Sequence, residues 1–265
     1  MRASESDLIH EKVQTQFGAT AAAYTTSAGD GDASALGKLV QMADAKPTDR
    51  VLDIATGAGH TALAFASQAG EVIAYDLTEA MLRETEKNAR ARDLSNVTTR
   101  QGPAEMLPFP DSSFEITVVR LASHHFADNA QAVREMARVT REGGRVVVVD
   151  NYGPEDDALD AELQHVETLR DASHVRSYKL SVWRATLESA GLRVTSEVTE
   201  RYSDSVRGMN FEDWVKRART PEDRVRELRR IFTEPSEALR ALLKIEEIDG
   251  AIWFTLPQVT LVAVK

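Results

Sequence analysis

The sequence predicts an α/β fold built on a doubly wound, mostly parallel sheet of seven strands, and three observations support this. Between residues 51 and 150, short runs rich in Val and Ile alternate with longer helical patterns, which is the rhythm of βαβ units around a parallel sheet. The first of these runs leads straight into a glycine turn that opens a helix. Neither an internal repeat nor a low-complexity segment interrupts the alternation.

Seven segments have the composition expected of strands. Most are almost wholly apolar, as parallel strands are when helices cover both faces of their sheet. The expected strands cover residues 51–54, 72–76, 97–101, 114–119, 145–150, 192–202 and 258–264.

The helices that connect the first strands carry recognisable end signals. One helix begins near His60 and ends before Gly70, a residue that can adopt the left-handed conformation that closes a helix. The next begins at Thr78, where the threonine can cap the first turn and Glu79 complements the helix dipole.

A third connecting helix covers residues 129–138 and stops before the Gly143-Gly144 pair, which supplies a turn into the next strand. Further helical patterns lie outside the βαβ block. They cover residues 5–22, 34–45, 156–170, 181–190 and, as a long charged stretch, 211–243.

The length of the chain favours one core with attached helices. A chain of 265 residues is long for one minimal α/β domain and short for two large ones. We expect residues 1–46 to form a helical lid, and residues 203–255 a helical insert that contributes to a substrate pocket. The core then consists of residues 47–202 and 256–265, with residues 151–180 as a cap segment.

Composition excludes several classes of partner and site. The formal net charge of −10 argues against a nucleic-acid partner, because phosphate backbones bind clustered Lys and Arg. The chain has no cysteine, and its histidines lack metal-ligand spacing, so no metal site is expected. The first twelve residues lack the apolar run of a secretory signal, and no segment approaches the ~20 apolar residues that span a bilayer. We therefore expect a cytoplasmic protein without membrane insertion. The sequence leaves open whether the protein forms a homodimer.

The run VLDIATGAGH, residues 51–60, indicates a ligand site. Glycine at Gly57 and Gly59 removes the Cβ atoms that would block a ligand from the backbone, and permits positive φ where the chain reverses. The spacing Gly57-x-Gly59-x-x-Ala62 also fits the turn that binds the pyrophosphate of nicotinamide dinucleotides. The turn by itself therefore leaves two cofactor classes open.

Two acidic residues narrow the choice between the two cofactor classes. Asp76 closes the second strand, where a carboxylate can accept hydrogen bonds from both hydroxyls of a ribose. Asp53 lies inside the first strand, where it would repel a pyrophosphate but suits the cationic amino-acid end of S-adenosylmethionine. The pair favours the sulfonium cofactor.

Four motifs in order resemble a known family. The runs VLDIATGAGH, YDLTEAML, QGPAEMLPFPDSSFEI and REGGRVVVVD are similar to class I methyltransferases of the ubiquinone/menaquinone-biosynthesis C-methyltransferase type. The resemblance covers residues 17–191, and the runs QFGATAAAYTTSA and RDASHVR resemble a small bacterial subgroup without an assigned substrate. It implies a Rossmann-like methyltransferase core, S-adenosylmethionine as cofactor, S-adenosylhomocysteine as product and a small-molecule methyl acceptor.

The resemblance also implies roles for individual positions. Around the methionine half of the cofactor it places Asp53, Ala55, Thr56, Gly57 and Gly59. Around the ribose and the adenine it places Asp76, Leu77, Met81, Pro103, Ala104 and Glu105. Near the sulfonium it places Arg120, Leu121 and His125, with Phe17 and Tyr24 as part of a lid.

Two positions depart from the family pattern. Ala55 stands where the family often has Gly, and Pro103 stands where it usually has an Asp that accepts the adenine amino group. Proline offers neither a carboxylate nor an N–H, so adenine recognition must rest on Glu105 or on backbone groups after Pro103. We expect somewhat weaker cofactor binding than in relatives that keep the acid.

Methyl transfer by in-line displacement to a carbon, oxygen or nitrogen atom is the function that this pattern favours. If the acceptor carries a proton, His125 and His174 are the candidate bases, and His124 and Arg176 are candidate substrate contacts. Two alternatives stay open at this point. One is a protein that binds S-adenosylmethionine without methylating, and the other is a nicotinamide-dependent oxidoreductase.

Overall fold

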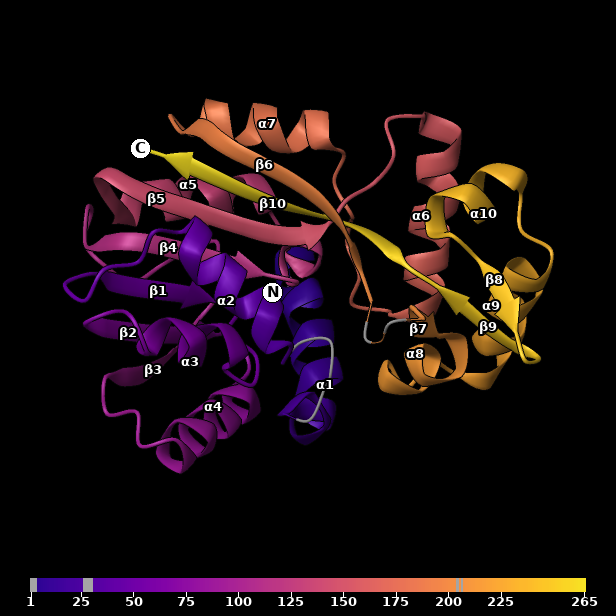
Figure 1. Cartoon of the computed structure of the whole chain (residues 1–265), viewed down its shortest axis with the longest axis horizontal. Helices are drawn as coiled ribbons and strands as arrows, with labels where there is room; N and C mark the ends of the chain where they lie inside the picture. Colours follow the sequence, from indigo (N-terminus) through magenta and orange to yellow (C-terminus); the bar gives the residue numbers. More distant parts are fainter. Residues whose placement is uncertain (1–3, 26–30, 204, 206) are drawn as a thin grey trace.

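A seven-stranded sheet forms the centre of the larger lobe of the protein (Figure 1), in the order β3-β2-β1-β4-β5-β10-β6. The computed structural model describes residues 4–25, 31–203, 205 and 207–265, with the side chains of residues 22–25 outside this description. Among the described strands of this sheet, β10 alone runs opposite to the others. The strands are β1 (Arg50–Ile54), β2 (Glu71–Asp76), β3 (Val97–Gln101), β4 (Phe114–Arg120), β5 (Thr140–Asn151), β6 (Arg193–Tyr202) and β10 (Leu256–Val264). The expected doubly wound, mostly parallel sheet is confirmed.

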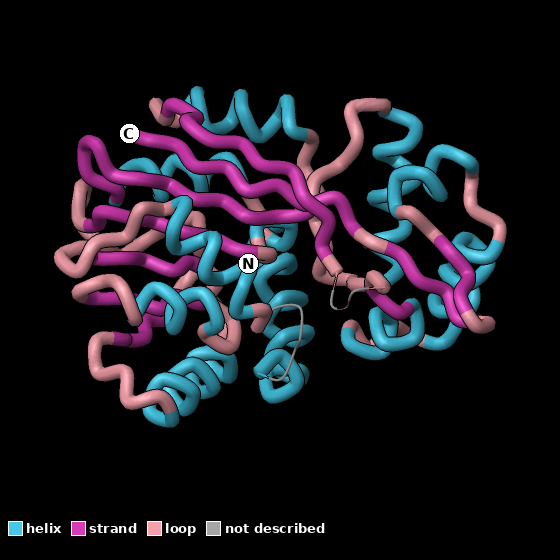
Figure 2. The backbone as a smooth tube through the Cα atoms, viewed as in Figure 1, coloured by secondary structure: helices cyan, strands magenta, loops and turns pink. Residues whose placement is uncertain are grey.

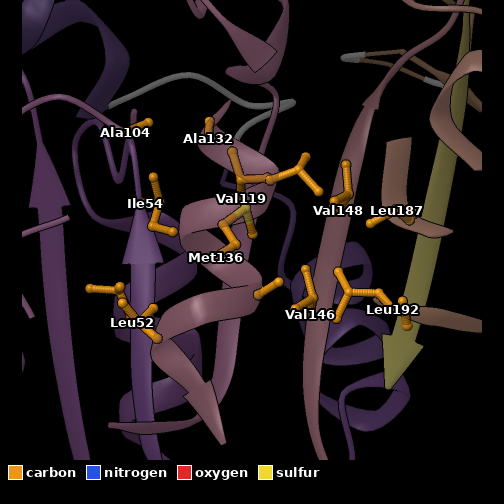
Figure 3. Packing of buried hydrophobic residues seen from close by; sticks show 14 of the residues in the cluster. Leu52, Ile54, Ala104, Val119, Ala132, Met136, Val146, Val148, Leu187 and Leu192 are labelled. Atoms are coloured by element: carbon orange, nitrogen blue, oxygen red, sulfur yellow. The ribbon is translucent and has the colours of Figure 1, made fainter. Parts of the chain in front are cut away.

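Helices cover both faces of this sheet, because successive strand residues point to opposite sides and both sides are apolar. One face packs on α2 (Ala33–Met42) and α3 (His60–Ala66), and the other on α5 (Asn129–Val139) and α7 (Leu180–Ser189). Figure 3 shows the second face, where strand residues such as Leu52 and Val148 meet Met136 of α5 and Leu187 of α7. Helix α4 (Glu79–Ala91) packs beside β2 and β3 at the edge of the sheet.

A smaller lobe lies beyond the far ends of β6 and β10 (Figure 2) and has its own apolar core. The charged stretch expected to be helical forms α8 (Phe211–Arg217), α9 (Glu222–Thr233) and α10 (Glu237–Leu243), and α6 (Asp157–Arg170) packs against them. A three-stranded antiparallel sheet, not predicted from the sequence, joins this lobe. Its strands are β7 (Met209–Asn210), β8 (Glu246–Ile248) and β9 (Ala251–Phe254), in the order β7-β9-β8.

Three positions that were expected to end or begin a helix or strand have other roles in the structure. Helix α3 ends at Ala66, and Gly70 lies outside the left-handed region; a Cβ there would lie 2.7 Å from the carbonyl oxygen of Pro47. Thr78 occupies the cap position of α4, but its side chain makes no capping hydrogen bond. The Gly143-Gly144 pair lies within β5, in an irregularity between the register pairs of Thr140 and Arg145, and not in a separate turn.

Helix α1 (Glu5–Thr25) stands across the open end of the main sheet, between the two lobes (Figure 1). It packs chiefly on α4. Over the described ranges, no helix has the length and apolar character needed to cross a membrane.

Candidate cofactor and acceptor site

A cavity opens beyond the carboxyl ends of β1, β2 and β4, which is where doubly wound sheets bind their ligands, and α1 forms part of its wall. Of the expected site residues, the wall contains Phe17, Ala55, Thr56, Gly57, Asp76, Leu77, Met81, Pro103, Ala104, Glu105, Arg120, Leu121 and His125. It also contains residues that the sequence did not mark as site candidates, namely His10, Val13, Ile54, Ala58, His60, Thr61, Tyr75, Thr78, Gly102, Ala122 and Phe126.

The remaining candidates are not part of this wall. Asp53 lies buried in β1, and Gly59 lies at the start of α3, just behind the turn. The candidates that belong to a polar cluster next to the cavity are His124, His174 and Arg176. Tyr24 belongs to α1, but its side chain lies outside the described residues.

The glycine turn has the backbone that its sequence predicts. Gly57 and Gly59 have φ values of +56° and +89°. A Cβ added to Gly57 would meet nothing within 4 Å, whereas one on Gly59 would lie 2.8 Å from Cγ2 of Thr85. Helix α4 holds the turn from behind, since the Thr85 hydroxyl donates to the Gly57 carbonyl at 2.8 Å and the Asn88 amide donates to the Ala58 carbonyl at 3.0 Å. The turn is therefore rigid on the protein side and open on the cavity side.

Two residues of the wall that are not glycine also have left-handed backbone. Ala55 has a φ of +54° at the end of β1, and Leu121 has a φ of +55° at the end of the neighbouring β4. A residue with a Cβ is disfavoured in this region by roughly 1–2 kcal/mol. The carboxyl ends of the two central strands thus carry local strain at the edge of the cavity.

Replacing Ala55 by Gly is expected to raise the free energy of unfolding by up to about 1 kcal/mol, because relief of the left-handed strain outweighs the entropy that glycine adds to the unfolded chain. Urea denaturation measures the change. Ala58→Gly, at a buried position with ordinary backbone in the same turn, should instead lower stability. Equal losses in the two variants would show that Ala55 is not strained.

Asp53 is buried beneath the turn and organises it. Its carboxylate accepts a hydrogen bond from the Thr56 hydroxyl at 2.6 Å and another from the backbone N–H of Ala62 in α3. Burial raises the pKa of Asp53 to about 7, although these hydrogen bonds and the nearby Arg120 oppose the rise. The charged form of this acid is therefore poorly stabilised by the protein alone.

Asp76 reaches the cavity wall itself. One carboxylate oxygen accepts the Gly57 N–H at 2.9 Å and the other accepts the Thr78 N–H at 2.7 Å. Burial raises the pKa of Asp76 to about 6 against both hydrogen bonds. Each carboxylate oxygen has a second lone pair, so the side chain can still accept hydrogen bonds from a ligand.

Together the two acids make one end of the cavity favourable to positive charge. Each raises the electrostatic cost of ionising the other, and the charge of Asp76 contributes to the raised pKa of Asp53. A cationic ligand would stabilise both ionised forms, whereas an anionic group such as a pyrophosphate would add repulsion.

Glu105 connects the far side of the cavity to the helix above it. One of its carboxylate oxygens accepts the backbone N–H groups of Ala127 and Asp128 at 2.8 and 3.2 Å. The other lies 3.3 Å from Nε2 of His10 in α1. Pro103, at the start of the same loop, offers only its carbonyl group.

Helix α1 also touches the rest of the site and the smaller lobe. The ring of Phe17 meets that of His125 edge to face, with 4.9 Å between centroids. The Gln16 side chain donates to the backbone carbonyl of Ala218 in the smaller lobe at 2.7 Å. The helix thus links both lobes over the cavity, as a lid would.

The other two histidines near His125 are held by the protein. The Nδ1 atom of His124 lies 2.6 Å from a carboxylate oxygen of Asp150. Burial lowers the pKa of this histidine, but Asp150, Glu167 and Asp171 together outweigh burial and the pKa is raised. His174 donates from Nε2 to the Gln164 side-chain oxygen at 3.0 Å, and burial lowers its pKa to about 2. Neither ring lines the cavity.

Arg176 is likewise engaged, since its guanidinium forms an ion pair with the buried carboxylate of Asp160. This ion pair ties Arg176 to helix α6. Among the residues that the structure describes, no group of three or more His, Asp or Glu side chains could hold a metal ion.

Comparisons with known proteins identify the family. The family model described as a methyltransferase domain matches residues 52–148. The uncharacterized methyltransferase YcgJ of Bacillus subtilis is 39% identical over 218 residues, which cover 81% of this chain and 83% of that protein. Its crystal structure matches with a TM-score of 0.80 at 37% identity, over 88% of this chain and 98% of that one.

Two further relatives agree. The structure of BH2331 from Bacillus halodurans C-125 matches with a TM-score of 0.81 at 36% identity, over 88% of this chain and 99% of that one. The ubiquinone/menaquinone biosynthesis C-methyltransferase UbiE of Shewanella oneidensis is 32% identical over 124 residues, covering 45% of this chain and 49% of that protein. These matches confirm the resemblance read from the four motifs and decide against the oxidoreductase reading of the glycine turn. The chain belongs to the class I S-adenosylmethionine-dependent methyltransferases and is an enzyme that transfers a methyl group from that cofactor.

Proposed function

We propose that the cavity under α1 binds S-adenosylmethionine and that the acceptor is a small molecule bound beside His125. The observation that carries this proposal is the pair of buried acids at a glycine turn that is open toward the cavity. The turn would hold the amino-acid part, with the buried Asp53 behind it supplying negative charge, and Asp76 would hold the ribose. Leu77 and Met81 would pack on the adenine, whose polar edge would meet backbone groups after Pro103, because Glu105 is engaged elsewhere.

The cofactor supplies a methyl group on a sulfonium, which a nucleophile displaces in line. The protein has to position the acceptor and exclude water. Phe17, Leu121 and Phe126 give the wall near His125 an apolar surface, and α1 covers it. His125 is the one member of the histidine cluster that lines the cavity, so we assign to it, and not to His174, any proton that the acceptor releases.

Calorimetry on the purified chain tests the proposal. Titration with S-adenosylmethionine and with S-adenosylhomocysteine should each give heat that saturates at one equivalent, and titration with NAD should give none. Formation of S-adenosylhomocysteine together with a methylated acceptor then separates an active enzyme from a protein that only binds the cofactor. Heat with NAD and none with the sulfonium compound would show that this cavity does not bind S-adenosylmethionine.

Binding of S-adenosylmethionine should strengthen about tenfold or more between pH 5 and pH 7.5. Asp53 and Asp76 have pKa values raised to about 7 and about 6, so in the free protein they hold protons at pH 5 that a cationic ligand must displace. Affinity therefore falls as pH drops through these values. S-adenosylhomocysteine lacks the sulfonium charge and should show a shallower slope. Parallel slopes for the two compounds would contradict an electrostatic role for the acids.

A further inference from the structure

His125 lines the cavity, and one nitrogen of its ring is held by the segment around Ser173. Its Nδ1 atom lies 3.0 Å from the carbonyl oxygen of Ser173 and 3.2 Å from the Ser173 hydroxyl. Its Nε2 atom has no hydrogen-bond partner among the side chains and backbone groups that the structure describes. As far as the described residues go, the ring therefore has one anchored nitrogen, Nδ1, and one nitrogen without a partner, Nε2.

The anchoring groups decide which nitrogen carries the proton. The Ser173 carbonyl can only accept a hydrogen bond. The Ser173 hydroxyl donates its own proton to a carboxylate oxygen of Asp171 at 2.6 Å, so toward His125 it also acts as an acceptor. The same Asp171 oxygen accepts the Ser173 N–H at 2.8 Å, which fixes the segment. Two acceptors facing Nδ1 require that Nδ1 bears the hydrogen and that Nε2 of the neutral ring has a free lone pair.

The surroundings keep this ring neutral. Burial lowers the pKa of His125 to about 4, and the neighbouring His124 adds to the effect, although Asp171 and Asp150 oppose it. His174 also faces the ring, with 6.4 Å between the ring centroids. Near neutral pH, His125 is therefore a hydrogen-bond acceptor and a weak base at Nε2.

We propose that Ser173 and Asp171 are positioning residues that hold His125 in its Nδ1–H tautomer, and that the methyl acceptor is a phenol or an enol whose proton goes to Nε2. This inference rests on the proposed function of the cavity. A weak base suits such an acceptor, because a hydroxyl oxygen or ring carbon becomes strongly acidic as it gains the methyl group. An ammonium group would have to be deprotonated before attack, which a weak base does poorly.

The transfer balances as follows for a phenol. A lone pair of the acceptor oxygen forms the new bond to the methyl carbon, and the electron pair of the breaking carbon–sulfur bond stays on sulfur. The O–H bond of the acceptor breaks, its electron pair stays on oxygen, and the proton binds to Nε2 of His125. For an enol attacked at carbon, the same hydroxyl proton is lost as the carbonyl group forms. Water takes the proton from His125 after product release.

Nitrogen NMR on the full chain, labelled with ¹⁵N-histidine, tests the positioning role without an acceptor. His125→Gln identifies the His125 signals, and His165→Gln, at an exposed position of the smaller lobe, is the matched control. We expect the neutral Nδ1–H tautomer from pH 7.5 down to pH 5.5. In Asp171→Ala the Ser173 hydroxyl is free to donate to Nδ1 while the Ser173 carbonyl still accepts from it, so the Nε2–H form should appear beside the Nδ1–H form. Asp171→Asn, which keeps an acceptor oxygen, should restore the wild-type tautomer.

An imidazolium or an Nε2–H ring at pH 7 in the wild-type chain would overturn the inference, as would an unchanged tautomer in Asp171→Ala. Titration of the same labelled samples with S-adenosylhomocysteine reports separately on the proposed function of the cavity. With 1-naphthol and 1-naphthylmethylamine, an alkyl amine that is an ammonium ion near neutral pH, as probes, we expect methyl transfer to the naphthol that falls about 10²-fold in His125→Gln. Transfer to the amine that survives this substitution would overturn the acceptor class.

Discussion

Replacing Asp76 by Ala is expected to weaken the binding of both S-adenosylmethionine and S-adenosylhomocysteine by about 10²-fold. Hydrogen bonds to a charged acceptor contribute roughly 1.5–3 kcal/mol each, and the loss of even one strong pair corresponds to one to two decades of affinity. The ribose is common to both compounds, so the affinity for both should fall. The substitution also leaves the Gly57 and Thr78 N–H groups without their carboxylate acceptor, which loosens the turn. Calorimetry at pH 7.5 measures the effect.

Two variants separate charge from shape in this prediction. Asp76→Asn keeps the size of the side chain and one acceptor oxygen, so we expect an intermediate loss that is larger for the sulfonium compound than for its uncharged product. Glu79→Gln removes an exposed acid three residues away, in the first turn of α4, and should leave both affinities within about twofold. An Asp76→Ala protein that bound both compounds normally would place the ribose elsewhere.

The central sheet could be predicted because its signals are local. Each parallel strand is a short apolar run, and such runs keep their meaning wherever they pack. The same holds for the turn at Gly57 and Gly59, whose positive φ values follow from residues adjacent in the chain. Asp53 and Asp76 can be identified as site residues because Asp53 precedes the glycine turn and Asp76 ends a strand. The sequence does not show that Asp53 lies behind the cavity wall and contacts the turn.

The contacts of α1 could not be predicted, because they join positions that are distant in the chain. His10 and Glu105 are separated by 95 positions, and Gln16 and Ala218 by 202. No periodicity within either segment specifies the partner. Taken as single residues, Pro103 lacks a carboxylate for the adenine and Glu105 carries one, whereas in the fold the Glu105 carboxylate accepts the Ala127 N–H.

The helical insert shows another reason why part of the fold could not be predicted from the sequence. The charged pattern between residues 211 and 243 predicts helix correctly, but the flanking strands are only two to four residues long and pair only through tertiary contact. Strands this short carry little signal of their own. The tautomer of His125 is equally non-local, since Ser173 lies 48 positions away. Tertiary placement, and not residue type, turns one histidine of three into a candidate base.

Replacing Trp214 by Ala is expected to lower the free energy of unfolding by about 3–5 kcal/mol, the range for deleting a large aromatic side chain from a core. The indole is 1% exposed and lies with its centroid 5.0 Å from that of Phe254 and 5.6 Å from that of Phe232. The guanidinium of Arg170 lies 5.0 Å above it. Trp253→Ala, at a half-buried position in the same lobe, is the matched control and should cost less.

The shape of the unfolding curve in Trp214→Ala bears on how the lobes cooperate. Strands β6 and β10 extend between the central sheet and the smaller lobe, and Ala218, directly after the helix that carries Trp214, accepts the hydrogen bond from Gln16 of α1. We therefore expect a single urea transition at lower denaturant, and faster dissociation of S-adenosylhomocysteine from the folded fraction because α1 loses support. Two separate transitions, with the core unchanged, would mean that the smaller lobe folds independently and that α1 is held by the core alone.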